Sequence, residues 1–311
     1  MFRWLVNVAF LALPIAATLG ILLGLQAHRQ ASGQTPLFVP PLDNKWVEKT
    51  YCQKSTGIHP ETKGQEYTLN PNQWAWNKGD PGFLCMNVTT YNNQTYATGT
   101  TAPQFNVVWE YPQAKATDQP VHAFPNIKVD GDVLPAKLQS VSSIGIDMAW
   151  TMRLDNKTGA STSVDELTAA NVNSNVAIDM FLDSDKSRAA DSEKAKYEVM
   201  VWFAAIGPAT FAIGQGNGTV TTKTLDGTKF NLYYGRNGRE QHVLTWKATE
   251  TAHDFHGDIS PLIEEILQSN EPNYPKKADY LGYFSFGSEA YYSNKPVTFS
   301  VPSLSIDIRI Y

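Results

Sequence analysis

One glutamate, Glu198, lies in the segment "YEVMVWFA" (197–204), which otherwise has the apolar composition of a buried strand. Successive side chains of a strand point to opposite faces, so Glu198 shares its face with Met200 and Trp202, while the other face carries only valines and a phenylalanine. A surface that only meets water has no need of a carboxylate, a thioether and an indole in a row. This face is therefore a candidate for binding or chemistry.

A second acid, Glu289, stands in similar company in "YFSFGSEAYYS", between small residues and a pair of tyrosines, 91 positions after Glu198. Two glutamates on strands of one sandwich could face each other across a concave sheet. Such a pair can hydrolyse a glycosidic bond, because one carboxyl donates a proton to the leaving oxygen and the other attacks or stabilises the anomeric carbon. Spacing alone leaves the alternative open that both are ordinary surface acids.

Other candidate motifs are incomplete. The stretch "GQGNG" (214–218) leads into "TVTTKTL" and not into a helix, which predicts a turn and not a phosphate-binding loop. "DSDKSRAAD" (183–191) lacks the central glycine and terminal acid of a calcium loop, and predicts a solvated loop. "HDFHGD" contains His253, His256 and Asp258, but nothing elsewhere completes a zinc site. We therefore expect no metal and no cofactor.

The elements that must position the two glutamates are short alternating segments separated by Gly, Asn, Asp and Pro, among them "QFNVVWEY", "NVAIDMFLD", "KFNLYYG" and "QHVLTWKA". Many short strands with turn signals between them predict an all-β sandwich or barrel. One segment, "DISPLIEEILQSN" (258–270), has helical apolar spacing, capping residues and an early proline, which predicts a short helix. With 311 residues, we favour one large domain over two small ones.

The amino terminus has a different character. Residues 5–25 contain no charge and would span about 31 Å as a helix, close to the thickness of a bilayer core. We favour an uncleaved signal anchor over a cleaved signal peptide within residues 1–27, because the apolar stretch is long and its cleavage site is poor. Residues 28–44 are polar and contain prolines, as in a stalk, and residues 45–311 form the expected β-sandwich or barrel domain.

Several features indicate the secretory pathway, with the folded domain extracellular or luminal. The only two cysteines, Cys52 and Cys85, lie close together in sequence, although two free thiols remain the alternative. Four N-x-S/T sequons predict N-glycosylation, at Asn87, Asn93, Asn156 and Asn217. The net charge is −5 and the basic residues are scattered, which argues against nucleic acid as a partner. We expect a monomer.

The stretch "NVAIDMFLD…YEVMVWFA" resembles the D-x-F…Y-E-x-M-I/V-W signature of glycoside hydrolase family 12, which contains fungal endo-β-1,4-glucanases and xyloglucan hydrolases. "GTKFNLYYGRNG", "HGDISPLIEEIL" and "YFSFGSEAYY" follow in the order of the family. Upstream, "YTLNPNQWAWN" resembles its N-N-x-W stretch, "VHAFPNIKV" resembles one of its strands, and the cysteine pair resembles its amino-terminal disulfide. The similarity extends from about residue 50 to the end of the chain.

This resemblance implies a β-jelly roll of two packed antiparallel sheets, whose concave sheet forms an open groove for a β-1,4-glucan. Glu198 matches the nucleophile of the family and Glu289 its general acid/base. Asp179 matches an acid that lies against the nucleophile and could share a hydrogen bond with it. Both glutamates would lie on strands of the concave sheet.

The resemblance also implies residues that bind the substrate. Trp74 matches a tryptophan that stacks on a sugar, and Met200 and Trp202 would shape the site of the reacting sugar. Trp109 and Asn126 are weaker candidates for the groove, and core packing remains the alternative for either tryptophan, Trp74 or Trp109.

The expected function is that of a retaining endo-β-1,4-glucanase that acts on cellulose, mixed-linkage glucan or xyloglucan. The alternative is a jelly roll that binds carbohydrate or the cell wall without turnover. Pro71 and Gln73 interrupt the N-N-x-W stretch, and Ala290 replaces a proline after the acid/base. These departures bear on substrate preference more than on chemistry, since all three carboxylates are present.

Overall fold

Helix α1 (Phe2–Ala31) lies at the amino-terminal end of the chain in the computed structural model, which describes residues 2–31, 46–91, 96–113, 121–154 and 161–311. The chain divides into two units, Met1–Asn44 and Lys45–Tyr311. The membrane anchor expected over residues 5–25 would lie within α1. Among the described residues, no helix combines the length and the apolar character needed to cross a membrane, so the expected anchor is not confirmed.

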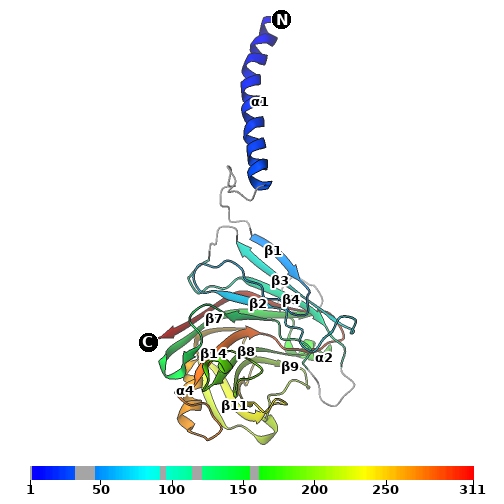
Figure 1. Ribbon diagram of the computed structural model, residues 1–311. Coiled ribbons are helices and arrows are strands. Elements are labelled where there is room, and N and C mark those ends of the chain that lie inside the picture. Colours follow the sequence, from blue (N-terminus) through cyan, green and yellow to red (C-terminus); the bar gives the residue numbers. More distant parts are fainter. Residues whose placement is uncertain (1, 32–45, 92–95, 114–120, 155–160) are drawn as a thin grey trace. The chain divides into compact units, whose positions relative to one another are not determined.

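The second unit consists of two β-sheets that form layers, with β9 and β11 in one and β1, β3 and β4 in the other (Figure 1). The six-stranded sheet has, in spatial order, β1 (Trp46–Tyr51), β3 (Phe83–Tyr91), β4 (Gln104–Glu110), β16 (Val297–Ile310), β7 (Val141–Leu154) and β13 (Asp254–Asp258). This confirms the expected all-β sandwich.

The second sheet forms the floor of the candidate site. Its order within the described residues is β10 (Thr221–Leu225), β11 (Thr228–Arg236), β12 (His242–Ala248), β9 (Tyr197–Ile206), β8 (Asn173–Asp183), β14 (Tyr280–Gly287), β5 (Asn126–Val129) and β2 (Tyr67–Asn70). Two shorter strands join it at the side, β15 (Ala290–Tyr292) on β8 and β6 (Ala136–Lys137) on β14.

One strand pair departs from the expected antiparallel arrangement. Strand β12 pairs with β9 in parallel, with Val243 opposite Glu198, whereas β9 and β8 are antiparallel. A parallel pair needs a long connection, and the chain between Ile206 and His242 supplies it through the hairpin of β10 and β11. This pairing brings the turn after β11 next to Glu198.

Aromatic side chains from both sheets meet between the layers. Phe286 of β14 lies 6.4 Å from Phe299 of β16, and Phe203 of β9 lies 5.4 Å from Phe255 of β13, measured between ring centroids. All four rings are buried. The inner face of the site sheet is thus held by packing, which leaves its outer face free to carry polar groups.

The predicted helix near residue 260 is confirmed as α4 (Ser260–Ser269), which packs against β7. Its first residues are held by Asp258, which accepts hydrogen bonds from the backbone N–H of Ser260 (2.8 Å) and from its hydroxyl (2.9 Å). Pro261 is the second residue of the helix. In the described part of the chain, the remaining helical segments are α2 (Val164–Ala169), α3 (Lys186–Ala189) and the 3-10 turns η1 (Leu138–Ser140) and η2 (Gln215–Asn217).

Residues 183–191 were expected to form a solvated loop, but they contain helix α3. The side chain of Asp185 accepts hydrogen bonds from the N–H groups of Ser187 and Arg188, which caps the helix. Arg188 then contacts Asp183 (3.1 Å) at the end of β8. These contacts fix the segment that carries Ser192 and Glu193 to the edge of the site.

Candidate active site

Strand β9 has the two faces that its sequence predicts. Val199, Val201 and Phe203 are fully buried in the core, and Glu198 is partly exposed on the opposite face. Met200 and Trp202 share the face of Glu198 but are nearly covered, and the Trp202 indole N–H lies 3.3 Å from the Met200 sulfur. The face singled out from the sequence is therefore the floor of a groove, with the carboxylate as its polar group.

The register of β8 on β9 brings Asp179 to the same face. Asp179 lies opposite Met200, and Phe181 lies opposite Glu198, so Asp179 and Glu198 are diagonal neighbours on adjacent strands. Diagonal side chains on one sheet face are close enough for long side chains to interact. A register shift between Val176 and Ala177 separates this alignment from that of the first residues of β8.

Glu289 lies in the two-residue link between β14 and β15, and not on a strand as expected. The side chain of Asn175 on β8 fixes this link at two points: its oxygen accepts a hydrogen bond from the Glu289 N–H (2.9 Å), and its amide nitrogen donates to the Glu289 carboxylate. Ser174 also donates to the Glu289 carbonyl (2.6 Å). Glu289 is thus held over β8 by its neighbours in the sheet.

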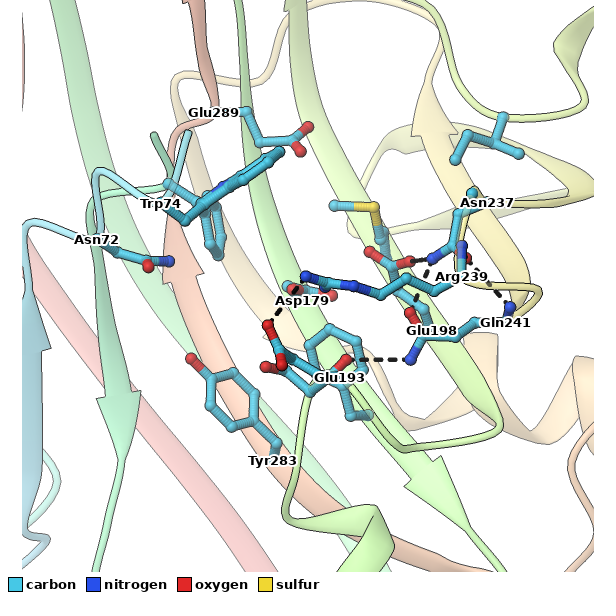
Figure 2. Close-up of a pocket in the computed structure, with 16 residues that line it drawn as sticks. Asn72, Trp74, Asp179, Glu193, Glu198, Asn237, Arg239, Gln241, Tyr283 and Glu289 are labelled. Carbon is cyan, nitrogen blue, oxygen red and sulfur yellow. Dashed lines mark hydrogen bonds and ion pairs between the residues drawn. The ribbon is translucent and has the colours of Figure 1, made fainter. Parts of the chain in front are cut away.

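Two adjoining hollows of about 440 and 630 Å³ form the groove around these acids. The first hollow, of 440 Å³, is also lined by Asn72, Asp179 and Tyr283, and the second, of 630 Å³, by Trp202 and Phe211. Both are lined by Glu198 and Glu289, as well as by Trp74. Figure 2 shows Glu198 and Glu289 projecting into the first hollow, Glu198 from β9 and Glu289 from the link between β14 and β15. The two glutamates therefore lie in the middle of an open groove, with space on both sides for a chain.

The environment of Glu289 favours its protonated form. Burial, followed by the negative charge of Glu198, raises the pKa of Glu289 to about 7, against the opposing effect of the hydrogen bonds from Asn175 and Tyr291. The Tyr291 hydroxyl lies 3.4 Å from the carboxylate. A carboxyl with this pKa can hold a proton at neutral pH and give it up during a reaction.

The environment of Glu198 contains two groups that stabilise its anion. Burial raises its pKa above the ordinary value, and a hydrogen bond from the Asn237 amide (3.0 Å) and the positive charge of Arg239 offset only part of this rise. Asn237 is itself oriented by Gln241, whose side-chain oxygen accepts a second hydrogen bond from the same amide (2.8 Å). The surroundings of the two glutamates therefore differ, because the charge of Arg239 acts on Glu198 and no such cation among the described residues acts on Glu289.

Asp179 is the most deeply buried of the three acids. Burial and the charges of Glu198 and Glu289 raise its pKa well above the ordinary value. One of its oxygens, Oδ1, has no hydrogen-bond partner among the described residues, and the expected hydrogen bond to Glu198 is not present between them. A neutral Asp179 relieves the repulsion that three neighbouring carboxylates would otherwise produce.

A comparison of the sequence with protein-family models matches glycosyl hydrolase family 12 over residues 65–309. The chain belongs to this family. A probable xyloglucan-specific endo-beta-1,4-glucanase A of Aspergillus flavus is 26% identical over 247 residues, which cover 79% of this chain and 87% of the relative. The corresponding protein of Aspergillus clavatus is 32% identical over 198 residues, 63% of this chain and 68% of the relative.

The fold of family 12 is also found among solved structures. Endoglucanase 3 of Trichoderma harzianum superimposes with a TM-score of 0.64 at 22% identity, covering 84% of this chain and 98% of that structure. A family 12 xyloglucanase of Bacillus licheniformis superimposes with a TM-score of 0.61 at 15% identity, covering 84% and 100%. The similarity in structure establishes the jelly-roll sandwich.

Trp74, which is expected to stack on a sugar, has a side chain exposed to solvent at 51% and lines both hollows. Its position depends on the residue before it. The Gln73 amide donates to the carbonyl oxygens of Gln53 (2.9 Å) and Leu84 (3.4 Å), and its oxygen accepts from Tyr111 (2.8 Å). The glutamine that departs from the family pattern therefore anchors Trp74.

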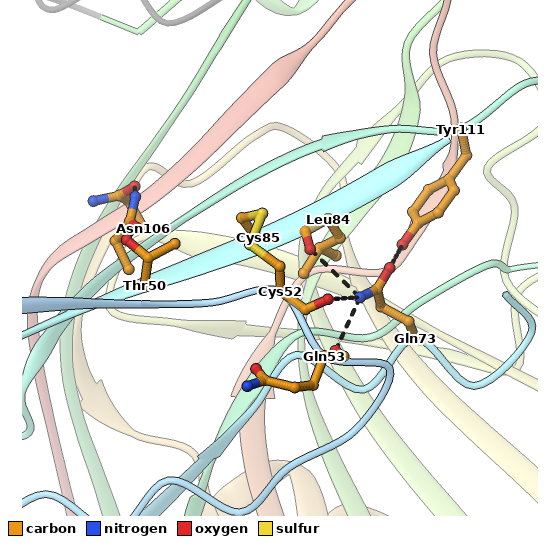
Figure 3. The surroundings of a disulfide bond; sticks show 9 residues. Thr50, Cys52, Gln53, Gln73, Leu84, Cys85, Asn106 and Tyr111 are labelled. Atoms are coloured by element: carbon orange, nitrogen blue, oxygen red, sulfur yellow. Dashed lines mark hydrogen bonds between the residues drawn. A yellow bond between two sulfur atoms is a disulfide. The ribbon is translucent and has the colours of Figure 1, made fainter. Parts of the chain in front are cut away.

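The cysteines support the same segment. Cys52 and Cys85 form a disulfide, as expected, and Figure 3 shows it next to Gln73. The Cys52 carbonyl is a further acceptor for the Gln73 amide, at 3.4 Å. The disulfide links the chain before β2 to β3, and so joins the two segments whose carbonyl oxygens, those of Cys52 and Leu84, accept hydrogen bonds from the Gln73 amide.

Trp109 and Asn126, two of the proposed groove residues, do not line the groove. Trp109 is 0% exposed and stacks on Tyr111 in the core, at 6.1 Å between ring centroids. Asn126 is buried, and its amide donates to the Phe124 carbonyl (2.7 Å). Trp109 therefore packs in the core, which was the alternative to a place in the groove, because neither face of its ring is open to a sugar.

The segment "HDFHGD" (253–258) packs against a tryptophan ring and caps helix α4. His256 pairs with Asp147 (2.8 Å), His253 lies 4.5 Å from the Trp150 ring, and Asp258 holds the start of α4. Among the described residues, no group of three or more His, Cys, Asp or Glu is arranged to hold a metal.

Two of the four predicted glycosylation sites can be described. Asn217 is exposed in η2, whereas the Asn87 side chain on β3 accepts from Thr50 (2.7 Å) and donates to Asn106 (2.9 Å). Asn93 and Asn156 lie outside the described residues. Glycosylation at all four positions stays a prediction.

Several residues of the site were not found from the sequence. Asn175 and Tyr291 contact the Glu289 carboxylate, Asn237 and Arg239 act on Glu198, and Phe211 is exposed at 60% in the second hollow. Asn237 and Arg239 belong to "GRNGR" (235–239), whose composition is typical of a turn. Only the parallel pairing of β12 with β9 brings that turn to Glu198.

Proposed function

We propose that the chain hydrolyses internal bonds of a β-1,4-glucan, such as cellulose, mixed-linkage glucan or xyloglucan, by a double displacement with retention. The observation that supports the proposal is the difference between the surroundings of Glu289 and those of Glu198. Glu289 has a pKa of about 7 and can act as the acid, whereas Glu198 has Asn237 and Arg239 to stabilise its anion. The open groove on both sides of this pair suits attack within a chain.

In the first step, Glu289 gives its proton to the glycosidic oxygen as the bond to the anomeric carbon breaks, and Glu198 forms a bond to that carbon. In the second step, Glu289 removes a proton from a water molecule, which attacks the same carbon and releases the Glu198 carboxylate. A protonated Asp179 beside Glu198 avoids a second negative charge there during both steps.

Trp74, Met200 and Trp202 are proposed to bind the sugars next to the cleaved bond. The exposed face of Trp74 offers a flat apolar surface for a sugar ring, and Met200 with Trp202 forms the covered floor below. Phe211, exposed on the other side of the second hollow, can supply a further apolar surface. The relatives named above carry xyloglucan in their names, which supports including a branched glucan among the substrates.

The test is a reducing-sugar assay of the purified chain on a panel of β-1,4-glucans and xyloglucan, with Glu198→Gln as the matched variant. We expect the variant to lose on the order of a thousandfold or more in kcat and to retain binding, since its shape is unchanged. If neither protein releases reducing ends while both bind the polysaccharides, the alternative of a non-catalytic binding jelly roll would replace this proposal.

We further propose export through the secretory pathway, which is supported by the Cys52–Cys85 disulfide. Whether residues 5–25 anchor the protein or are removed is tested by carbonate extraction of membranes and by amino-terminal sequencing. An anchor predicts that the chain stays in the membrane pellet with its glycans on the catalytic side. A mature form that begins near His28 would show instead a cleaved signal.

A further inference from the structure

A third hollow, of about 450 Å³, adjoins the catalytic groove. Glu193, Arg239 and Gln241 line both this hollow and the first hollow of the groove. The two spaces are therefore separated by a wall that is one layer of side chains thick. Figure 2 shows the catalytic side of this wall, where the Arg239 side chain extends from the Asn237 turn to Glu193.

The base of the wall is fixed. Gln241 is buried, and its amide donates to the carbonyl oxygens of Ser192 (3.0 Å) and Ala195 (2.8 Å). These bonds tie the turn after β11 to the segment between α3 and β9. Each Gln241 amide proton has a partner on that segment, so this part of the wall keeps its place when a ligand binds.

The top of the wall is held more weakly. Arg239 and Glu193 form an ion pair of 2.9 Å, but their side chains are 55% and 69% exposed. An exposed ion pair between long side chains contributes little to stability, because water screens it and both side chains lose freedom. A ligand that offers hydroxyl groups can therefore displace or share this pair, and reach over the wall from the groove into the third hollow.

The third hollow is rich in hydrogen-bonding groups, and most of its charged side chains have a partner of opposite charge. Lys194 pairs with Asp191 (2.6 Å), and Glu240 pairs with Arg236 (2.9 Å). His242 is nearly covered and its pKa is lowered, mainly by burial, which favours the uncharged ring. Such a lining suits a neutral molecule with many hydroxyls more than an anion or an apolar group.

We propose that the third hollow is an additional sugar-binding subsite, which takes a neutral sugar unit of a glucan already bound in the groove. This inference rests on the proposed function, since the remainder of the glucan must occupy the first hollow. The unit can come from two sources, the next unit of the main chain or a side unit attached to it. Both are neutral and present hydroxyl groups to Lys194, Lys196 and the wall.

The test removes donors that line the third hollow but neither of the other two. In the variant with Lys194→Ala and Lys196→Ala, two exposed lysines are lost and the wall is untouched. A variant with Lys186→Ala and Lys229→Ala removes the same charge from exposed positions outside all three hollows, Lys186 being on the same segment. Both variants and the parent chain are compared by kcat/KM.

One arm uses unbranched β-1,4-gluco-oligosaccharides of increasing length, and the other compares xyloglucan with an unbranched mixed-linkage glucan. We expect the ratio of kcat/KM for long over short substrates, or for branched over unbranched ones, to fall about three- to tenfold in the Lys194/Lys196 variant, as for the loss of one or two hydrogen bonds. The first result indicates a main-chain unit and the second a side unit. Ratios equal to those of the control variant in both arms would overturn the proposal.

The same proteins separate this proposal from the proposed function. If the parent chain hydrolyses none of the substrates, affinity electrophoresis in gels that contain xyloglucan or mixed-linkage glucan replaces the kinetics. Weaker retardation of the Lys194/Lys196 variant than of the Lys186/Lys229 variant would support the subsite without catalysis. Equal retardation of the two variants would refute it.

Discussion

Asn175 binds Glu289 at two points, accepting from its backbone N–H and donating to its carboxylate. The Asn175 side chain therefore fixes the position of Glu289. It also stabilises the Glu289 anion, because its hydrogen bond opposes the rise in the pKa of Glu289. Glu289 lies outside the regular strands, so the rigidity that it needs comes from this contact with β8.

The variant Asn175→Ala should therefore lower kcat and move the alkaline limb of the pH profile to higher pH. Loss of the hydrogen bond removes a stabilisation of the Glu289 anion, so its pKa rises, and a less fixed acid should cost about tenfold in kcat. Asn231→Ala, on β11 outside the hollows, is the control. Thermal unfolding of both variants separates this effect from a loss of stability. An unchanged profile with an intact fold would contradict the role of Asn175.

The pKa of Glu289 also predicts the shape of the wild-type profile. The acid works only when protonated, so kcat/KM should fall as the pH rises through about 7. Because the charge of Glu198 is one cause of the raised pKa, Glu198→Gln should lower the pKa of Glu289. Carbon-13 NMR titration of labelled glutamate carboxyls measures this shift without turnover. A Glu289 signal that titrates at the same pH in both proteins would show that the two acids do not interact.

Arg239 should set the position of the acidic limb of the pH profile. Asp179 and Glu289 face Glu198 as acids, Asn237 contacts it as a neutral donor, and Arg239 is the cation whose charge lowers its pKa. In Arg239→Gln the pKa of Glu198 should rise, so Glu198 takes up a proton at higher pH and activity falls earlier as the pH is lowered. The measurement is kcat/KM against pH, with Arg309→Gln on β16 as a distant control. An acidic limb that stays in place would refute the electrostatic role of Arg239.

The disulfide carries a prediction about both stability and binding. The variant with Cys52→Ala and Cys85→Ala opens a loop with a sequence separation of 33, which should lower the free energy of unfolding by about 3–4 kcal/mol. KM should rise as well, because Cys52 and Leu84 provide carbonyl acceptors for the residue that anchors Trp74. Urea unfolding and steady-state kinetics measure the two effects. An unchanged midpoint would contradict the stabilising role of the disulfide.

The alternation of apolar and polar residues was sufficient to predict which face of its strand carries Glu198. The same alternation also indicates that Trp109 is buried, although Trp109 was expected in the groove. In "QFNVVWE", Phe105, Val107 and Trp109 share one face, and all three are buried. The same rule that separates Glu198 from Val199 would have assigned Trp109 to the core. Trp74 lies outside any strand, so no periodicity could show that its ring is exposed.

The partners of the two glutamates could not be predicted from spacing. Asn237 reaches Glu198 only because β12 lies parallel to β9, and Asp179 is a diagonal neighbour of Glu198 only because of the register of β8 on β9. A shift of one residue in that register would turn Asp179 to the core face. Pairing and register depend on contacts between segments far apart in the chain, which local patterns do not contain.

The stereochemistry of the first product tests the mechanism directly. If Glu198 is the nucleophile, its carboxyl group should lie about 5 to 5.5 Å from that of Glu289, whereas a base that activates water would stand roughly 6.5 to 9.5 Å away. Attack by Glu198 inverts the anomeric carbon once, and the water assisted by Glu289 inverts it again. The first sugar released should therefore be the β-anomer, which proton NMR detects before mutarotation mixes the anomers. An initial α-anomer would exclude Glu198 as nucleophile, even if replacing either glutamate abolished turnover, because a single inversion requires water and not a carboxylate to attack the sugar.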